Sequence, residues 1–337
     1  MTWLVTGGAG YIGSHIVAAL RASGDPELAP VVLDDLSAGY RSFVPAGVPF
    51  ANVNILDQTK VEATILNHGI TGVIHVAGFK YAGVSVERPL HTYRVNVEGT
   101  RILLDAMLRQ GVDRIVFSSS AAVYGTPDVD LVTEQTPTHP ESPYGESKLI
   151  GEWLLADVAR QEERAGRHFR HTSLRYFNVV GSGSDARYDT SPHNLFPLVF
   201  DTLRKGGTPR INGDDYATAD GTCVRDYVHV ADVALAHVEA ARILTAGDPL
   251  APLYNLGSGV GSSVRQIMDA IRAATGHDFV PEIAPRRPGD PARIVASGAL
   301  ATRDLNWRMR HTVDDMVSSA WSARVAAGDT YPQHTSQ

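Results

Sequence analysis

The N-terminal segment holds the feature that most limits how this chain can fold. Residues 3–15 read WLVTGGAGYIGSH, so an apolar run is followed by Gly7, Gly10 and Gly13 and then by a helical pattern. Glycine adopts positive φ without strain and allows close approach of neighbouring backbone. The spacing GxxGxxG between a strand and a helix predicts a tight turn whose helix N-terminus can bind an anion. Such a unit is a typical beginning of a parallel sheet covered by helices.

Short apolar runs and longer helical patterns alternate through the first half of the chain. Strands are expected at Trp3–Thr6, Val31–Asp34, Pro49–Ile55, Gly72–Ala77, Arg114–Ser118 and His171–Asn178. Helices are expected at Ile12–Ala22, Val61–Asn67, Thr92–Arg109 and Pro143–Arg164. Strands that are apolar on both faces and separated by helices indicate a parallel sheet with both faces covered. Right-handed crossovers then predict an α/β, Rossmann-type doubly wound fold.

The second half of the chain has a different texture. The stretch NVVGSGSDARYDTSPHN, residues 178–194, predicts a long loop of the kind that often carries function. Beyond it we expect helices at Leu195–Lys205, Val230–Ala246, Val264–Thr275 and Val313–Ala326, with short strands between them. The predicted division is a first domain at 1–178 with parts of 224–257, a smaller mixed α/β lobe at 179–223 and 258–330, and a polar tail at 331–337.

An acidic residue follows the glycine turn at the expected distance. Asp34 ends the second predicted strand, 21 residues after Gly13. A carboxylate at this position accepts hydrogen bonds from the adenosine ribose of a bound dinucleotide. Asp34 and Asp35 together would repel a 2′-phosphate, which favours NAD over NADP. A tight turn that binds no ligand is the alternative.

Tyr144 and Lys148 form a second constellation, in the segment SPYGESK. Residues four apart share one face of a helix. An ammonium near a phenol favours the phenolate, so we expect Lys148 to lower the pKa of Tyr144 and to make it a usable base. The strand FSSSAAVYG places small hydroxyls about 25 residues earlier, and Ser120 could hold a substrate hydroxyl beside the phenol. These residue types beside a dinucleotide predict hydride-transfer chemistry.

Composition excludes several other classes of protein. The chain has 337 residues, a net charge of −7 and 43% apolar residues, so no broad basic field is available for nucleic acid or a membrane surface. Its one cysteine, Cys223, excludes an internal disulfide and fits a reducing cytoplasm. We expect no leader and no membrane span, and the histidines, His75 included, show no metal-ligand pairing.

Five segments together resemble the extended short-chain dehydrogenase/reductases, and more narrowly the UDP-glucose (UDP-galactose) 4-epimerases. They are TGGAGYIG, the SSS and YxxxK pair, LRYFN, DGTCVRDYVHVADVALAH and RRPGD, and the similarity runs from Met1 to about Val325. The resemblance implies that tightly held NAD takes the C4 hydride while Tyr144 takes the hydroxyl proton, and that hydride returns to the other face of a 4-keto sugar. Ser120 would bind the 4-oxygen, and Lys148 would contact the nicotinamide ribose. A homodimer formed through the helices near Thr92–Arg109 and Pro143–Arg164 is also implied.

The resemblance assigns the first domain to NAD and the lobe to a UDP-sugar, residue by residue. Positions matching NAD contacts are Gly7, Gly10, Tyr11, Ile12, Gly13, Asp34, Asn54, Ile55, Val76, Ala77, Gly78, Lys80, Asn96, Ser118, Tyr144, Lys148 and Phe177. Positions matching UDP-sugar contacts are Lys80, Ser120, Tyr144, Asn178, Asn194, Leu195, Arg225, Tyr227, Arg287 and Asp290. The alternatives are a structural role for Asn96, surface ion pairs for Arg225 and Arg287, and a surface position for Lys80.

The sequence also departs from the family pattern. Asn54 replaces a usual aspartate near the adenine, Val84 replaces a glutamate, and Asn212 replaces an apolar or aromatic residue near the uracil. The loop 181–193 lacks an insertion found in close relatives. Its Arg187 could pair with a C6 carboxylate, so a UDP-glucuronate 4-epimerase is a second hypothesis, and a solvated arginine is the alternative. Ile294, where relatives select for or against an N-acetyl group, has intermediate bulk.

Other activities fit the sequence less well. A 4,6-dehydratase needs an acid pair where Ser120 is followed by Ala121 and Ala122. A UDP-glucuronate decarboxylase and a net dehydrogenase share the first oxidation step and stay open. A non-catalytic NAD-sensing regulator would have no need of Ser120, Tyr144 and Lys148 together.

Overall fold

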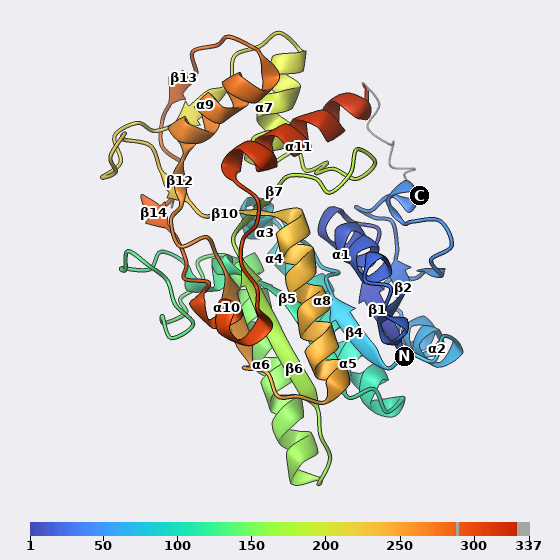
Figure 1. Ribbon diagram of the computed structural model, residues 1–337. Coiled ribbons are helices and arrows are strands. Elements are labelled where there is room, and N and C mark those ends of the chain that lie inside the picture. The colour runs from blue at the N-terminus through green and yellow to red at the C-terminus, as the bar shows by residue number, and fades with distance from the viewer. Residues whose placement is uncertain (288–289, 329–337) are drawn as a thin grey trace.

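The computed structural model describes residues 1–287 and 290–328. Its centre is a parallel sheet of seven strands (Figure 1). The strand order is β11-β6-β5-β4-β1-β2-β3. The strands are β1 (Thr2–Thr6), β2 (Ala29–Asp34), β3 (Phe50–Asn52), β4 (Gly72–His75), β5 (Arg114–Ser120), β6 (Arg170–Tyr176) and β11 (Leu253–Leu256). The chain winds outward from β1 in both directions, so the predicted doubly wound α/β fold is confirmed.

Helices cover both faces of this sheet. One face packs against α1 (Tyr11–Ala22), α8 (Val230–Ala246) and α10 (Ala299–Leu305). The other packs against α2 (Gln58–Asn67), α5 (Gly99–Arg109) and α6 (Pro143–Arg164). Alternate residues of β1 serve the two cores, since Trp3 and Val5 belong to the first and Leu4 to the second. This two-sided burial is why the strands read as continuous apolar runs.

The remaining segments form a smaller unit beside the carboxyl edge of the sheet. Its strands are β7 (Asn178–Val180) paired with β10 (Tyr227–His229), β8 (Arg210–Asn212) paired with β13 (Glu282–Ala284), and β9 (Val224–Arg225) between β12 (Ser262–Ser263) and β14 (Arg293–Ile294). Its helices are α7 (Leu195–Arg204), α9 (Val264–Thr275) and α11 (Val313–Ala326), which share one apolar core. In Figure 1 they lie together above the sheet.

Local signals explain the helix limits that the sequence predicted well. Helix α6 begins after Ser142, whose side chain accepts a hydrogen bond from the Gly145 amide, with Pro143 as its first residue. Helix α9 begins with a capping box at Ser263 and ends at Gly276 in the left-handed conformation.

Three predicted elements differ from the structure. The strand expected at Pro49–Ile55 pairs only over Phe50–Asn52. The strand expected to reach Asn178 ends at Tyr176, because residues 178–180 pair with β10 instead of continuing the main sheet. The helix expected from Thr92 begins earlier, with α3 (Ala82–Glu87), α4 (Pro89–Tyr93) and one wide turn, η3 (Arg94–Glu98), ahead of α5. The three short helical turns are η1 (Pro26–Leu28), η2 (Arg41–Phe43) and η4 (Ala121–Tyr124).

The predicted tail at 331–337 lies outside the described residues. Within the described part of the chain, no helix combines the length and the apolar character that crossing a membrane requires.

Candidate active site

A cavity of about 1460 Å³ lies at the carboxyl ends of the parallel strands and extends under the smaller unit. Its floor includes the residues that follow β1, β2 and β4, and its far wall includes residues of β8, β9 and α7. Ligand-binding crevices of open α/β sheets occupy this edge. Pockets for one small ligand are on the order of 300–1,000 Å³, so this cavity has room for two sizeable ligands at once.

The glycine turn at the floor of the cavity has no space for side chains. Gly7 has φ +70°, and a Cβ there would lie 2.7 Å from the Ala77 backbone nitrogen. A Cβ on Gly13 would lie 2.1 Å from the Gly7 carbonyl oxygen. The turn therefore requires glycine, and it leaves the N-terminus of α1 exposed to the cavity, as a pyrophosphate cradle needs.

Asp34 lies at the end of β2 and lines the same cavity. Its carboxylate accepts hydrogen bonds from the amides of Ala9 at 2.9 Å and Leu36 at 2.8 Å. These bonds hold the carboxylate beside the glycine turn, although burial raises its pKa. Both carboxylate oxygens keep a lone pair for ribose hydroxyls. The cradle and this acid fit NAD, which Asp34 and the neighbouring Asp35 favour over NADP.

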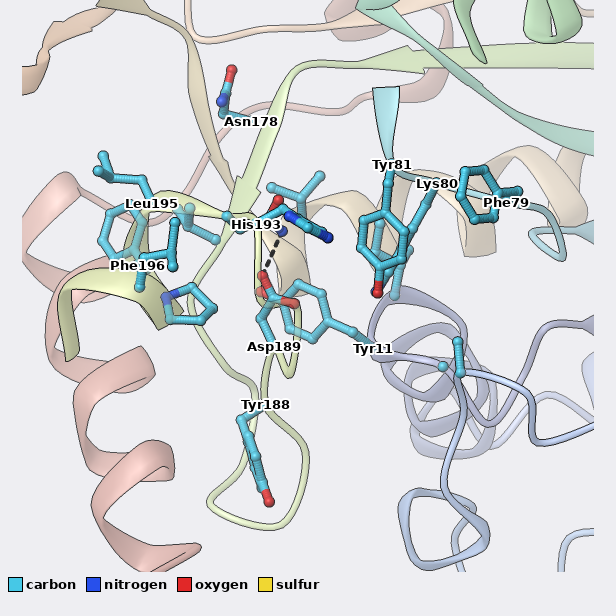
Figure 2. A pocket seen from close by; sticks show the side chains of 18 of the residues that line it. Tyr11, Phe79, Lys80, Tyr81, Asn178, Tyr188, Asp189, His193, Leu195 and Phe196 are labelled. Atoms are coloured by element: carbon cyan, nitrogen blue, oxygen red, sulfur yellow. Dashed lines mark hydrogen bonds between the residues drawn. The ribbon is translucent and has the colours of Figure 1, made fainter. Parts of the chain in front are cut away.

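Most of the residues predicted for ligand binding line this one cavity. Those in its wall are Gly7, Gly10, Tyr11, Ile12, Gly13, Asp34, Asn54, Ile55, Val76, Ala77, Gly78, Lys80, Phe177, Asn178, Asn194, Leu195, Arg225, Tyr227, Arg287 and Asp290. Those outside its wall are Asn96, Ser118, Ser120, Tyr144, Lys148 and Arg187. Figure 2 shows Tyr11, Lys80, Asn178 and Leu195 around the cavity.

Tyr144, Lys148 and Ser120 lie together beside the cavity wall. Ser120 ends β5 and hydrogen-bonds the Tyr144 hydroxyl. The Lys148 ammonium lies 5.9 Å from the centre of the Tyr144 ring and donates to the Ser118 carbonyl at 2.9 Å. A Cβ built on Gly78, a residue of the cavity wall, would lie 3.7 Å from the Lys148 nitrogen. The predicted group is therefore assembled at the edge of the cavity.

The electrostatics of this group differ from the prediction. Burial raises the pKa of Tyr144, and the hydrogen bond from Ser120 only partly opposes this rise. Burial also lowers the pKa of Lys148 to about 8, while the nearby Glu152 carboxylate opposes that decrease. The prediction that Lys148 gives Tyr144 a net lowered pKa is wrong for this structure, because desolvation outweighs an ammonium that lies beside the ring and bonds a carbonyl.

Three predicted cofactor contacts have clear structural partners. Asn96 bonds the backbone of Phe79 in both directions and donates to the Ser147 hydroxyl at 2.8 Å, which matches the structural alternative. The Ser118 hydroxyl lies 2.9 Å from His237 on the α8 side of the sheet. Asn54 donates to Asp35 at 2.7 Å and accepts from the Leu56 amide, so its oxygen keeps one lone pair for an adenine amino group.

The far end of the cavity is lined by cations and their partners. Arg225 donates to the Val224 and Pro291 carbonyls and lies 3.5 Å from the Asp290 carboxylate. Asn212, whose amide oxygen faces the Arg287 guanidinium, accepts from its Nε at 3.1 Å and from its Nη2 at 3.3 Å. Two oriented guanidinium groups are well suited to a diphosphate.

Arg187 does not reach the cavity wall. Its backbone closes a turn, in which its amide donates to Ser184 and its carbonyl accepts from the Ser182 hydroxyl. Its Nε is buried, with no hydrogen-bond partner among the described residues. The structure gives no support to a pairing of Arg187 with a sugar carboxylate.

Four residues of the cavity wall were not predicted as ligand-binding residues, although one of them, Asn212, was noted as a departure from the family pattern. Tyr81 and His193 approach from opposite sides, with ring centres 4.8 Å apart (Figure 2). Asp189 accepts from the Asn194 side chain at 2.6 Å, and Asn212 orients Arg287. The loop composition at 178–194 indicated a functional segment, but no sequence signal pairs His193 with a tyrosine over 100 residues earlier.

A glycine-lined dinucleotide cradle beside a serine, tyrosine and lysine group defines a protein of the short-chain dehydrogenase/reductase class. Comparison with known families narrows the class. The sequence model of the NAD dependent epimerase/dehydratase family matches residues 3–257, and the chain belongs to that family. The predicted resemblance is thereby confirmed.

Individual relatives match over nearly the whole chain. A UDP-glucose 4-epimerase of Corynebacterium glutamicum is 40% identical over 336 residues, covering 98% of this chain and 97% of the relative. A crystal structure of a UDP-glucose 4-epimerase has a TM-score of 0.92 at 39% identity, covering 99% of this chain and 100% of that one. A UDP-glucose 4-epimerase from Stenotrophomonas maltophila, with bound NAD and formylated UDP-arabinopyranose, has a TM-score of 0.89 at 38% identity, covering 97% and 99%.

Proposed function

We propose that the protein is an isomerase, an NAD-dependent 4-epimerase of a UDP-sugar. The observation that carries the proposal is one continuous cavity whose wall includes the glycine cradle, Gly78 beside the Lys148 ammonium, and Arg225 with Arg287. Two relatives named UDP-glucose 4-epimerase, which are similar to this chain over nearly their full length, support it. The bound NAD and UDP-sugar of one relative support both ligand classes.

The residues of this chain have distinct roles in the proposed reaction. When bound, NAD supplies the hydride acceptor and donor for C4 of the sugar, which passes through a 4-ketone. Tyr144 removes the proton from the 4-hydroxyl and returns it, and Ser120 donates a hydrogen bond to the same oxygen. Lys148 provides positive charge beside Tyr144, where it stabilises the phenolate. Asp34 and the glycine turn hold the cofactor, while Arg225 and Arg287 hold the diphosphate.

Among UDP-sugars, we propose UDP-glucose and UDP-galactose. A uronate would bring a carboxylate into the cavity, and the cation predicted to meet it, Arg187, is not in the cavity wall. Of the cations that line the far end, Arg225 and Arg287 are already assigned to the diphosphate, and Arg210 is paired with Glu282.

Proton NMR of the purified protein with catalytic NAD tests the proposal. UDP-glucose should yield its 4-epimer without net NADH, and UDP-glucuronate should remain unchanged. The matched control is Tyr144→Phe, which keeps the ring and should abolish turnover. Epimerisation of the uronate would replace the sugar assignment. Release of carbon dioxide, or net accumulation of NADH, would point to a decarboxylase or a dehydrogenase and exclude the 4-epimerase.

We also propose that two copies of the chain form a dimer through α3, α4 and α6. These helices contact one another and expose large apolar side chains, with Val86 61%, Leu90 83% and Trp153 57% exposed. Neighbouring exposed apolar residues are typical of an interface. Leu90→Asp should convert the dimer to a monomer in light scattering. Leu66→Asp is the matched control, because Leu66 is also exposed but lies on α2. A wild-type monomer would contradict the proposal.

The proposal also assigns each ligand to a part of the chain. We expect residues 1–178 with parts of 224–257 to bind the cofactor, and the pairing of β11 with β6 supports the return of 253–256 to the first domain. We expect 179–223 with 258–330 to bind the UDP-sugar, except for α10, which packs against the main sheet. We place the enzyme in the cytoplasm, and the support is Cys223, the free and only cysteine of the chain.

A further inference from the structure

Three consecutive serines at the end of β5 contact three successive turns of α6. Ser120 hydrogen-bonds Tyr144, the Ser118 carbonyl accepts from Lys148, and the Ser119 hydroxyl donates to Glu152 at 2.5 Å. Tyr144, Lys148 and Glu152 are four residues apart, so all three lie on the face of α6 that packs against β5. The proposed reaction uses the first two of these side chains and leaves Glu152 and Ser119 without a role.

Glu152 is a charged group held away from water. It is 8% exposed, and its partner Arg175, on β6, is 3% exposed. Arg175 donates to both carboxylate oxygens, from Nε at 2.8 Å and from Nη2 at 2.5 Å, and its guanidinium lies 4.8 Å from the centre of the Tyr124 ring. A buried ion pair is weak evidence for stability, since an apolar pair of similar volume is often as stable. Its location behind the active site therefore suggests another role.

Glu152 is the acidic group that acts on Lys148. Burial lowers the pKa of Lys148 to about 8, and the Glu152 charge raises it. Within the part of the chain that the structure describes, the other neighbours of the ammonium bring no negative charge. The Phe117 ring lies 5.1 Å away, and His75 on β4 stays neutral because burial, reinforced by Lys148, lowers its pKa to about 3.

The groups beside Tyr144 and behind Arg175 are also uncharged or already paired. Tyr176 on β6 faces Tyr144, and burial raises its pKa, so it remains a neutral phenol. Tyr124 donates to the Asn255 side chain at 2.8 Å, and burial raises its pKa as well. Glu134, farther back, accepts from the Asn255 amide at 2.8 Å and acts on Tyr124.

We propose that Glu152 is a positioning residue for the reaction: held by Arg175 and Ser119, its carboxylate keeps Lys148 protonated beside Tyr144. Without the carboxylate, the Lys148 ammonium would release its proton to solvent at a lower pH, because its surroundings are apolar. Without that charge the Tyr144 phenolate loses its nearest stabilising cation. The inference rests on the proposed epimerase function, because it concerns the proton on Lys148 during turnover.

Glu152→Gln tests this role, because glutamine keeps the shape of the side chain and an oxygen for Ser119 while removing the charge. The alkaline limb of the pH profile of kcat should move by about one pH unit or more to lower pH. When kcat is expressed relative to its value at neutral pH, kcat of Glu152→Gln at the alkaline end of the profile should be about tenfold lower than that of the wild type. Glu152→Asp, which restores the charge, should return the limb towards the wild-type position.

Two further variants separate this role from a purely structural one. Glu152→Gln combined with Arg175→Gln leaves no unpaired buried charge, so it preserves folding if the single variant does not. It should shift the profile in the same direction but by less, because the positive charge of Arg175, which disfavours the ammonium, is removed as well. Glu162→Gln is the matched control, since Glu162 pairs with Arg167 at the far end of the same helix and should leave the profile unchanged. A wild-type pH profile in the folded Glu152→Gln or double variant would overturn the proposal.

A spectroscopic titration distinguishes failure of this inference from failure of the proposed function. NMR titration of protein carrying 13C-labelled lysine, with Lys148→Met to assign the signal among the four lysines of the chain, reports ionisation of Lys148 without any turnover. The Lys148 signal should titrate at lower pH in the double variant than in wild type, even if the wild type epimerises none of the sugars tried. An unchanged Lys148 titration would overturn the role of Glu152 whatever the substrate is.

Discussion

The side chain of Asn96 bonds both polar backbone groups of Phe79. Its oxygen accepts from the Phe79 amide at 2.6 Å, and its nitrogen donates to the Phe79 carbonyl at 3.0 Å. Phe79 directly precedes Lys80, and both residues line the cavity. Asn96 lies in η3, the wide turn ahead of α5. The side chain that this turn presents therefore fixes the backbone of the segment that follows β4.

We predict that Asn96→Ala destabilises the protein by about 1–3 kcal/mol, because it leaves the Phe79 amide and carbonyl without their side-chain partner. Urea unfolding monitored by fluorescence measures the loss. Asn67→Ala is the control, since Asn67 is exposed at the end of α2 and should change the unfolding free energy by less than about 0.5 kcal/mol. Equal effects of the two substitutions would contradict the role of Asn96.

Signals that act over a few residues made much of the fold predictable. The glycines at 7, 10 and 13 determine one turn, and Ser142 with Pro143 determines the start of α6, so both could be located from adjacent letters. The lining of the cavity followed from the rule that strand ends meet at one edge of a parallel sheet.

Relationships between distant segments could not be predicted in the same way. Glu152, Arg175 and Ser119 come from α6, β6 and β5, and no local pattern in the sequence joins them. Arg187 was a candidate partner for a substrate carboxylate because of its charge and its place in a loop expected near the sugar, but the turn around it keeps it outside the cavity wall. The direction of the Tyr144 pKa shift also needed the structure, because burial is a property of the packed core.

His75 predicts a loss of stability in acid. It is buried between the Thr6 and Thr100 hydroxyls, at 2.7 and 3.0 Å, and burial lowers its pKa to about 3. Its pKa in the unfolded chain is about 6.5. The unfolded chain binds the proton more readily, so the contribution of His75 is complete above about pH 6.5 and decreases as the pH falls towards the folded pKa.

The corresponding measurement is the free energy of unfolding as a function of pH. His75→Gln removes the titrating group, so the slope between about pH 6 and pH 4 should decrease by about 1.4 kcal/mol per pH unit. The control is His68→Gln, which alters an exposed side chain at the end of α2 and should leave the slope as it is. An unchanged slope in His75→Gln would mean that His75 takes up no extra proton on unfolding.

The bond between Asn212 and Arg287 predicts an effect on binding rather than on chemistry. Asn212→Ala frees the guanidinium at the diphosphate end of the cavity, so KM for the UDP-sugar should rise about 5–20-fold, in line with the loss of about 1–2 kcal/mol. The value of kcat should stay within about twofold, because both residues lie at the end of the cavity away from Tyr144. Arg287→Ala should raise KM further. A fall in kcat at constant KM would show that Asn212 acts on the reacting end instead.

The contact between Tyr81 and His193 predicts energetic coupling across the cavity. Tyr81 belongs to the segment after β4 and His193 to the loop before α7, so their edge-to-face contact joins the two sides of the ligand site (Figure 2). Such pairs contribute about 0.5–1.5 kcal/mol beyond area burial. A double-mutant cycle of Tyr81→Ala and His193→Ala, measured as the dissociation rate of UDP, should give a coupling of that size, and each single variant should release UDP about 2–10-fold faster.

The control pair is Phe79 and His91, whose rings form a similar contact with ring centres 5.2 Å apart but come from one side of the cavity. A cycle on that pair should show no coupling in the dissociation rate, since the contact does not cross the cavity. If instead the effects of Tyr81→Ala and His193→Ala on UDP release are additive, the two rings do not act together to retain the ligand.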